Sequence, residues 1–439
     1  MIGAGAELRD EAVDLLRRLI RIDTSNPPGD ETPAAELLAS HLGEAGVDCE
    51  LVGPDPERLN LVARVPGDGS GPSVLLMAHT DVVPAPAENW TVPPFEGVVR
   101  DGQVVGRGAA DMKGELAART VALAALARSA EPPAGDVVLV AEADEERNTA
   151  DVGMSWLVRE RPELVRCDYA LNEGGGTLLE LADGRRVVTV SVGEKVVGAL
   201  RIRIHGTAGH ASVPDGADNP LRHLAAAVDA LLGVRAPARV TPVLERALNA
   251  LDAPAGADDD RIAWARDLHP TLADLLPSMT RLTVTPTGTQ SFEPSNVIPP
   301  YADLICDCRA LPGEGEDEVR AHVERALGDG FRYELQLLEP LEGGTESPIE
   351  TPLYETIEAY VAKRLPGAKL LPLVTPGFTD SHWVRGSLGT VAYGFAPIFT
   401  MDPDAYAAGA HGADEALDID DLAEMVAFHL RVLRTPGRR

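Results

Sequence analysis

The chain has 439 residues, 44% of them hydrophobic and 25% charged, which is the composition of a globular protein with room for two or three domains. Its net charge of −30 opposes binding to nucleic acid or to anionic membranes. No stretch approaches the roughly 18 uninterrupted apolar residues that span a bilayer. Residues 1–10 are acidic and polar rather than a signal peptide, so we expect a cytoplasmic protein.

The first half of the chain alternates between strands and helices. Residues 5–46 have the pattern of two helices joined by a polar turn, with apolar residues at helical spacing from Ala12 to Leu19. The segments that follow are predicted as strands at 60–65, 74–78, 137–141 and 169–171, with a helix at 114–127. This alternation predicts an α/β domain with a mostly parallel sheet.

The pattern changes near residue 196. The elements that follow are predicted as a strand at 199–205, a helix at 219–232, a helix-rich stretch to about residue 276, strands at 281–285 and 303–309, a helix at 317–327 and a strand at 332–337. Strand–helix–strand–strand–helix–strand is the order of a ferredoxin-like unit. We therefore expect an inserted α+β domain at 196–345, ending between 311 and 345. It would interrupt an α/β domain formed by 1–195 and 346–439.

Four segments place metal-binding types of side chain at strand ends or in the loops beside them. His79 and Asp81 follow the strand at 74–78, and Asp111 lies in a glycine-rich turn that enters the helix at 114–127. The other two segments follow the later strands and are Asp144-Glu145-Glu146 and Asn172-Glu173-Gly174. In open α/β sheets, binding sites form outside the carboxyl ends of the strands, so all four segments can meet in one crevice.

These residue types suit a pair of divalent metal ions. Two ions roughly 3.5–4 Å apart need a bridging carboxylate together with imidazoles and further carboxylates. That donor mixture suits zinc, with manganese or cobalt as alternatives. Of the neighbouring Glu145 and Glu146, one can bind metal while the other acts as a base toward water. Each residue alone also has a structural explanation. Glu145 and Glu146 could belong to a solvated acidic run, and Asp111 could be a helix N-cap worth about 1 kcal/mol. The four segments together favour the metal site.

The combined motifs resemble those of one metallopeptidase family, which contains aminoacylase-1, glutamate carboxypeptidase, carboxypeptidase S, acetylornithine deacetylase and succinyl-diaminopimelate desuccinylase. The matching segments are His79-Thr80-Asp81-Val82-Val83-Pro84, Gly106-Arg107-Gly108 with Asp111-Met112-Lys113-Gly114, Asp144-Glu145-Glu146 and Asn172-Glu173-Gly174-Gly175. The resemblance covers nearly the whole chain. It implies a dinuclear zinc site in the α/β domain.

Carried over to this chain, the resemblance implies a role for each motif residue. His79 and Glu173 would hold one zinc ion, and Glu146 and His411 would hold the other. Asp111, followed by a cis peptide, would bridge the two ions. Glu145 would be the general base and acid, and Asp81 would orient His79. His411, in Ala410-His411-Gly412, is named on the resemblance alone, because a loop histidine is otherwise its simpler interpretation.

The inserted segment resembles the lid and dimerisation domain of the same family. In Gly206-Thr207-Ala208-Gly209-His210-Ala211-Ser212-Val213-Pro214, the resemblance implies that His210 reaches the active site of a neighbouring subunit and stabilises an oxyanion. The substrate would be contacted by Asn296, by the loop at Gly377 and by Arg309, whose guanidinium can hold a carboxylate through two hydrogen bonds. A surface position on a strand is the alternative interpretation of Arg309.

The sequence therefore predicts a zinc-dependent hydrolase that acts as a homodimer. It would cleave the amide bond of a small substrate with a free carboxylate, either a dipeptide or an N-acyl amino acid. The segments at 172–176 and 393–397 most resemble the carboxypeptidase S and N-acyl amino acid hydrolase branch of the family. The alternatives are a biosynthetic deacetylase or desuccinylase of an N-acylated diamino acid, or a binding module that keeps the fold without catalysis.

Overall fold

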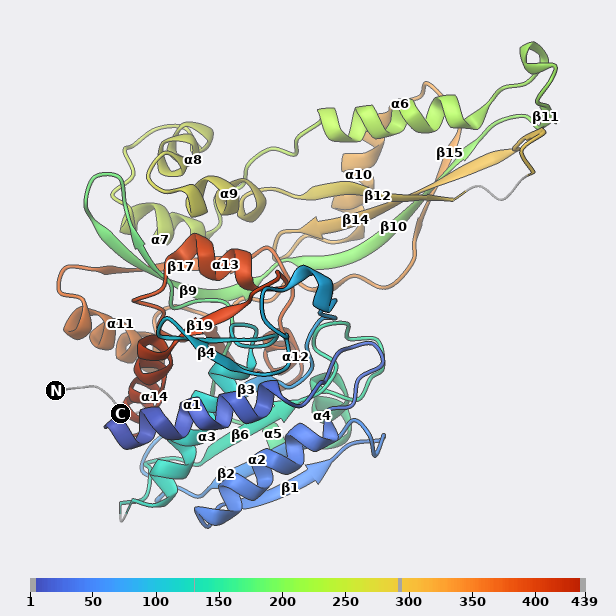
Figure 1. The fold of residues 1–439 in the computed structure, drawn as a ribbon. Helices are drawn as coiled ribbons and strands as arrows, with labels where there is room; N and C mark the ends of the chain where they lie inside the picture. The colour runs from blue at the N-terminus through green and yellow to red at the C-terminus, as the bar shows by residue number, and fades with distance from the viewer. Residues whose placement is uncertain (1–4, 130, 291–293, 435–439) are drawn as a thin grey trace.

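A nine-stranded sheet forms the centre of the main body in the computed structural model, which describes residues 5–129, 131–290 and 294–434 (Figure 1). From edge to edge its strands are β1 (Asp48–Val52), β2 (Asn60–Val65), β6 (Val137–Glu142), β3 (Val74–His79), β7 (Tyr169–Asn172), β18 (Val391–Gly394), β9 (Arg186–Glu194) and β17 (Lys369–Thr375), with β8 (Leu178–Glu180) beside β9. The central neighbours β6, β3, β7 and β18 are parallel. The predicted mostly parallel α/β sheet is confirmed.

Helices cover both faces of this sheet because its strand residues alternate between two apolar clusters. In β3, Leu76 and Ala78 pack into one cluster, and Leu75 and Met77 pack into the other. The helices over the first cluster are α1 (Ala6–Ile20), α2 (Thr32–Glu44), α3 (Lys113–Ala127), α11 (Pro352–Arg364) and α14 (Ile419–Arg434). Those over the second are α4 (Met154–Glu160), α5 (Pro162–Val165) and α12 (Ser381–Leu388). The main body is thus a three-layer α/β/α structure.

A second, antiparallel sheet projects from the main body (Figure 1). Its strands, in spatial order, are β12 (Thr283–Gln290), β14 (Tyr301–Ala310), β10 (Val196–His205) and β15 (Tyr333–Leu337), with β16 (Glu342–Gly343) also beside β10. The helices α6 (Pro220–Gly233) and α10 (Glu316–Leu327) share its apolar core. The order of these elements along the chain and the order of the strands in the sheet are both those of the predicted ferredoxin-like unit. The far end of this unit carries the short pair β11 (Gly209–His210) and β13 (Val297–Ile298).

Three helices between α6 and β12 pack against the large sheet. They are α7 (Pro242–Ala250), α8 (Asp258–Arg266) and α9 (Pro270–Met279). Leu244, Ile262 and Leu276 share an apolar cluster with Val187 of β9 and Leu371 of β17. This packing favours grouping the three helices with the main body, whereas the predicted insertion at 196–345 includes them. The domain bounds stay a prediction.

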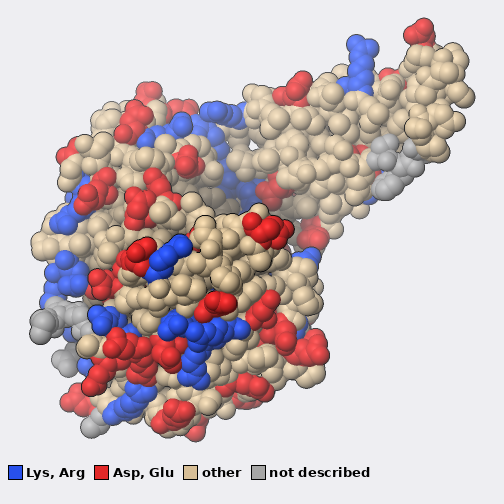
Figure 2. Space-filling model, in the orientation of Figure 1, with Lys and Arg blue, Asp and Glu red and all other residues tan. Residues whose placement is uncertain are grey.

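The remaining elements are short and lie around the main body and the inserted unit. They are β19 (Ala416–Asp418), β5 (Gln103–Val105) and β4 (Val98–Arg100) in one small sheet, α13 (Pro403–Gly409), and the 3₁₀ turns η1 (Ala87–Asn89) and η2 (Pro214–Gly216). Within the described ranges, no helix has the length and apolar character that crossing a membrane requires. Acidic side chains are spread over the visible face rather than gathered in one patch (Figure 2).

A buried arginine links helix α3 to the two central strands. The Arg119 guanidinium donates to the backbone carbonyls of Met77 and Asn172, the latter at 2.9 Å, and to Glu115 Oε2 at 2.6 Å. Its Nε lies 3.1 Å from Nε2 of His429. Burial and the neighbouring Arg119 lower the pKa of His429 to about 3, so this imidazole is neutral and accepts the hydrogen bond. Arg119 therefore fixes β3 and β7 at the point where they end.

Replacing Arg119 with Met is expected to destabilise the protein strongly. The variant leaves the Glu115 carboxylate buried without its cation, which costs about 3–5 kcal/mol. Thermal unfolding followed by circular dichroism should show a clear fall in melting temperature. The double variant Arg119→Met/Glu115→Leu should recover part of that loss, because it removes both charges. A single variant that melts with the wild type would contradict the assigned role.

Candidate dinuclear metal centre

Three neighbouring parallel strands deliver the predicted motif residues to one edge of the large sheet. His79 is the last residue of β3, which lies between β6 and β7. Glu145 and Glu146 follow β6, and Glu173 directly follows β7. Since the three strands run in the same direction, their carboxyl ends meet at this edge. The sheet thus brings together the first, third and fourth motif segments.

Asp111 lies between two histidines from distant parts of the chain. Its Oδ1 is 3.1 Å from Nε2 of His79, and its Oδ2 is 3.3 Å from Nε2 of His411. The Asp111–Met112 peptide is cis, as expected. Each carboxylate oxygen of Asp111 therefore faces a different imidazole, which is the placement that a bridging ligand between two metal ions needs.

The three glutamates surround the same two imidazoles. Oε2 of Glu173 and Oε2 of Glu145 lie 3.9 and 4.0 Å from Nε2 of His79. Oε2 of Glu146 lies 3.0 Å from Nε2 of His411. The ligand atoms of His79, Glu145 and Glu173 lie within 4.8 Å of one another, as do those of His79, Asp111 and Glu146. The structure therefore brings together all five predicted ligands and the predicted base, and it also places Glu145 at ligand distance.

The charges of this cluster fit divalent cations. Burial, with the nearby Glu173 carboxylate, raises the pKa of Glu145 well above its usual range, and burial raises that of Glu173 to about 8. Hydrogen bonds to Asp111 and Glu146 raise the pKa of His411 to about 10. Oε1 of Glu146 is buried and has no hydrogen-bond partner among the described residues. Imidazoles together with several closely spaced carboxylates form a ligand set that suits zinc or a similar divalent metal.

A buried carboxylate holds the loop that carries Asp111. Glu415 accepts hydrogen bonds from the backbone N–H groups of Gly108 (2.8 Å), Ala110 (2.7 Å) and Asp111 (2.9 Å), and from Nη1 of Arg107 at 2.6 Å. Gly108 has φ of +85°, a left-handed conformation that favours glycine. The glycine-rich turn is therefore a carboxylate-binding loop, and Glu415 sets the position of Asp111.

Asp81 connects His79 to the loop that carries the glutamates. Its backbone carbonyl lies 3.0 Å from Nδ1 of His79, closer than its carboxylate oxygen at 3.5 Å. The carboxylate accepts from the N–H groups of Glu145 and Glu146, both at 3.2 Å, and from Nδ2 of Asn26 at 2.9 Å. Asp81 thus orients the imidazole mainly through its backbone and orients the two glutamates through its side chain.

A cavity of about 550 Å³ opens beside the cluster. Arg309 and Gly377 line it, as predicted for residues near a substrate, and so does Phe378. Nε of Arg309 donates to Oδ1 of Asp307 at 2.9 Å, and its Nη2 donates to Oδ2 of Asp307 at 3.0 Å. The cavity lies between the main body and the inserted unit, because Asp307 and Arg309 belong to β14 and Gly377 follows β17.

His210 and Asn296 lie away from this cavity, at the far end of the inserted unit (Figure 1). His210 is exposed, and its Nδ1 accepts from the Ser212 N–H at 3.1 Å. The backbone carbonyl of Asn296 accepts from the Ala211 N–H at 2.9 Å, so the predicted substrate contact Asn296 lies beside the loop of His210. Within one chain they do not join the metal-type residues.

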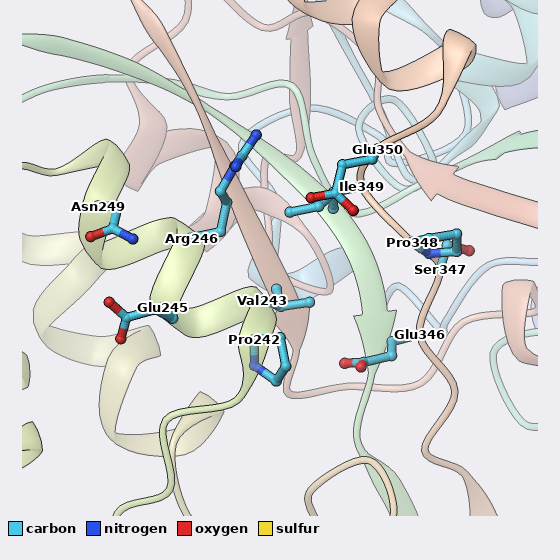
Figure 3. A pocket seen from close by; sticks show the side chains of 10 residues that line it. All are labelled: Pro242, Val243, Glu245, Arg246, Asn249, Glu346, Ser347, Pro348, Ile349 and Glu350. Atoms are coloured by element: carbon cyan, nitrogen blue, oxygen red, sulfur yellow. The ribbon is translucent and has the colours of Figure 1, made fainter.

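A second cavity, of about 530 Å³, lies between α7 and residues 346–350 (Figure 3). Arg246 and Asn249 line one side, and Glu346 and Glu350 line the other. None of its lining residues belongs to the His, Asp and Glu groups described above. The metal-type cluster and this cavity are therefore separate features.

Residues 75–435 match the model of Peptidase family M20/M25/M40. The N-fatty-acyl-amino acid synthase/hydrolase PM20D1 of Homo sapiens is 28% identical over 387 residues, 83% of this chain and 75% of that protein. The succinyl-diaminopimelate desuccinylase of Methylobacterium nodulans is 28% identical over 431 residues, 95% of this chain and 94% of that protein.

Solved structures share the fold. A family M20 metallo-carboxypeptidase from Sulfolobus solfataricus superposes with a TM-score of 0.72 at 19% identity, over 97% of this chain and 99% of that one. Human carnosine dipeptidase 1 superposes with a TM-score of 0.65 at 18% identity, over 96% of each chain. The predicted combination of an α/β body and an inserted ferredoxin-like unit is thus a known architecture.

Replacing Glu415 with Gln is expected to weaken metal binding. Both carboxylate oxygens of Glu415 accept hydrogen bonds from the Asp111 loop, whereas only one side-chain atom of the Gln, its amide oxygen, can do so. Loss of such a supporting partner typically lowers metal affinity by about 10- to 100-fold. Zinc affinity measured by competition with a chromogenic chelator checks this.

The matched control for this prediction is Asp414→Asn. Asp414 is the neighbouring residue, and its carboxylate accepts from the Thr91 N–H at 2.8 Å rather than from the Asp111 loop. It should bind zinc as the wild type does. Equal zinc affinity in the wild type and Glu415→Gln would show that this carboxylate does not support the centre.

Proposed function

The chain belongs to peptidase family M20/M25/M40 and is a metal-dependent hydrolase of amide bonds, and we propose that its substrate is a small amide with a free carboxylate. An N-acyl amino acid or a short peptide has this chemistry. The observation that carries the proposal is the Asp111 carboxylate, which faces His79 and His411 beside a cavity lined by Arg309.

The metal ions of this proposal are zinc. His79 and Glu173 would hold one ion, Glu146 and His411 the other, and Asp111 would touch both. When bound, such ions polarise a substrate carbonyl and lower the pKa of water. The mixture of imidazole and carboxylate donors supports zinc, with cobalt or manganese as substitutes.

Glu145 is the proposed general base and acid. Its carboxylate lies 4.0 Å from His79, and its backbone N–H is held by Asp81, so the side chain stays at the edge of the cluster. In this position it takes a proton from the attacking water and returns a proton to the leaving amine. Burial raises its pKa, which is the direction expected of a carboxylate that also acts as an acid.

Arg309 is the proposed partner of the substrate carboxylate. Nε and Nη2 already donate to Asp307, which leaves the Nη1 N–H groups and the second N–H of Nη2 for a substrate carboxylate. The Asp307 contact fixes the guanidinium plane, which reduces the entropy lost when a carboxylate binds. Gly377 and Phe378 line the same cavity and would contact the substrate chain.

A homodimer is part of the proposal, because His210 and Asn296 lie away from the cavity of their own chain. A second copy could bring both residues of its inserted unit to the centre, where the His210 imidazole would stabilise the developing oxyanion. The pairing of β11 with β13 supports this, since it holds the two residues close together at the same end of the inserted unit.

We also propose that the protein is cytoplasmic.

The second candidate is a desuccinylase or deacetylase of an N-acylated diamino acid. The desuccinylase of Methylobacterium nodulans, which is similar to 95% of this chain, supports it. A panel of dipeptides, N-acyl amino acids and N-acylated diamino acids separates the two candidates. Hydrolysis restricted to one acylated diamino acid would favour the second.

Replacing Glu145 with Gln is expected to lower kcat by about 100- to 10,000-fold, because the variant cannot accept the proton of water. Hydrolysis of N-acyl amino acids measures the loss, and metal content per chain is measured on the same sample. The control Glu339→Gln changes an acid of the same cavity outside the metal-type groups and should stay active. A Glu145→Gln enzyme with near wild-type kcat would disprove the role.

Activity is expected to be restored in trans between two inactive variants. His210→Ala lacks the proposed oxyanion donor, and Glu145→Gln lacks the base, but a mixed dimer contains one site with both groups intact. Mixing the two proteins after mild dissociation should raise hydrolysis above that of either variant alone. A wild-type enzyme that sediments as an active monomer would contradict the proposed role of His210.

A further inference from the structure

An arginine that the proposed mechanism does not use lines the catalytic cavity. Arg147 directly follows Glu146, and its side chain is exposed. It makes no hydrogen bond or ion pair with any residue in the described part of the chain. Arg147 and Arg309 are the two arginines that line this cavity, and the second is already paired with Asp307.

Two hydrogen bonds to Asp144 close the loop that presents Arg147. The N–H of Asn148 donates to the Asp144 carbonyl at 2.7 Å, and the N–H of Ala150 donates to the Asp144 carboxylate at 2.6 Å. Asp144 and Asn148 have φ of +65° and +49°, so the chain turns sharply on both sides of Arg147. Arg147 thus stands at the apex of a closed loop.

The base of this loop is anchored in the interior. The Asp144 carboxylate accepts from Nδ2 of Asn26 at 2.8 Å and from Nη2 of Arg58 at 3.2 Å. Arg58 is buried and also pairs with the buried Glu31. Because the backbone of this loop is anchored, only the Arg147 side chain itself has to be ordered when a ligand binds to it.

We propose that Arg147 determines specificity by binding a second carboxylate of the substrate, beyond the one assigned to Arg309. This inference rests on the proposed function. The protein carries a net charge of −30, so a cation that lines the cavity favours the approach of a dianionic substrate. A guanidinium holds a carboxylate through two hydrogen bonds. The preferred substrates are therefore N-acyl amino acids with two carboxylates, the second at the end of the acyl group or on the amino-acid side chain.

A contact with the inserted unit is the competing role for Arg147. Glu339 and Glu342 line the same cavity from the segment that follows β15. If the cavity narrowed during turnover, either carboxylate could pair with Arg147 without any contact to substrate. Such a contact would serve every substrate equally, whereas recognition of a second carboxylate would serve only dianionic ones.

Two matched substrate pairs separate these roles. N-succinyl-L-leucine and N-butyryl-L-leucine differ by a carboxylate in place of a methyl at the end of the acyl group. N-acetyl-L-glutamate and N-acetyl-L-norvaline differ in the same way on the side chain. For at least one pair, Arg147→Met should lower kcat/KM for the dicarboxylate by about tenfold or more. A loss of this size corresponds to one lost hydrogen bond between charged groups. The kcat/KM for the monocarboxylate of the same pair should stay unchanged.

The control Arg222→Met removes an exposed arginine of α6, outside the cavity, and should change neither member of a pair. Equal losses on both members of both pairs would overturn the inference and assign Arg147 to the contact with the inserted unit. Wild-type kcat/KM on all four substrates in Arg147→Met would also overturn it.

Failure of the proposed function is distinguishable from failure of this inference. If no substrate of either pair is hydrolysed, calorimetric titration of both pairs into zinc-loaded wild type and Arg147→Met decides between the outcomes. Tighter binding of a dicarboxylate than of its partner, lost in the variant, would support Arg147 while the proposed substrate class fails. Equal affinities within each pair would overturn the inference.

Discussion

Four carboxylates crowded around one buried imidazole are the constraint on which the rest of the structure depends. Asp111, Glu145, Glu146 and Glu173 converge near His79, although like charges in a low-dielectric interior repel one another. Burial, together with the neighbouring carboxylates, raises the pKa of Glu145 and of Glu173. Two divalent cations would relieve the repulsion and convert the cluster into a ligand set. The electrostatic repulsion between these carboxylates therefore favours the binding of metal ions.

The surrounding residues keep the carboxylates from moving apart. Glu415 fixes the Asp111 loop through three backbone N–H groups, and Asp81 fixes the two glutamates through their N–H groups. Arg119 ties the ends of β3 and β7 to helix α3. Each of these charged side chains is buried and bonded on several sides, which a buried charge requires. The scaffold therefore supplies rigidity where the centre needs it.

The sequence predicted the strand-end residues well because parallel strands share a direction. His79, Glu173 and the glutamates at 145 and 146 could be placed together from the order of strands alone, and the chain order around 196–337 predicted the ferredoxin-like unit. His411 could be found only by resemblance, since it lies in a loop more than 200 residues from the other ligands. Periodicity does not report which distant loop folds back over a sheet.

Other supporting residues could not be predicted for a related reason. Glu415 and Arg119 look like ordinary charged residues in sequence, and their burial follows from tertiary packing that no local pattern records. The packing of α7–α9 against β8, β9 and β17 is a further example. These helices lie within the predicted insertion by chain order, but their apolar faces match the edge of the large sheet. Position in the chain and position in space differ there.

The metal content of the purified protein and the effect of chelation on its activity test the dinuclear centre most directly. A dinuclear zinc site requires about two zinc ions per chain. We expect amide hydrolysis to be lost on chelation and to return when about two zinc ions per chain are added back. A protein that binds no divalent metal, or that hydrolyses N-acyl amino acids at full rate after chelation, would contradict the dinuclear centre.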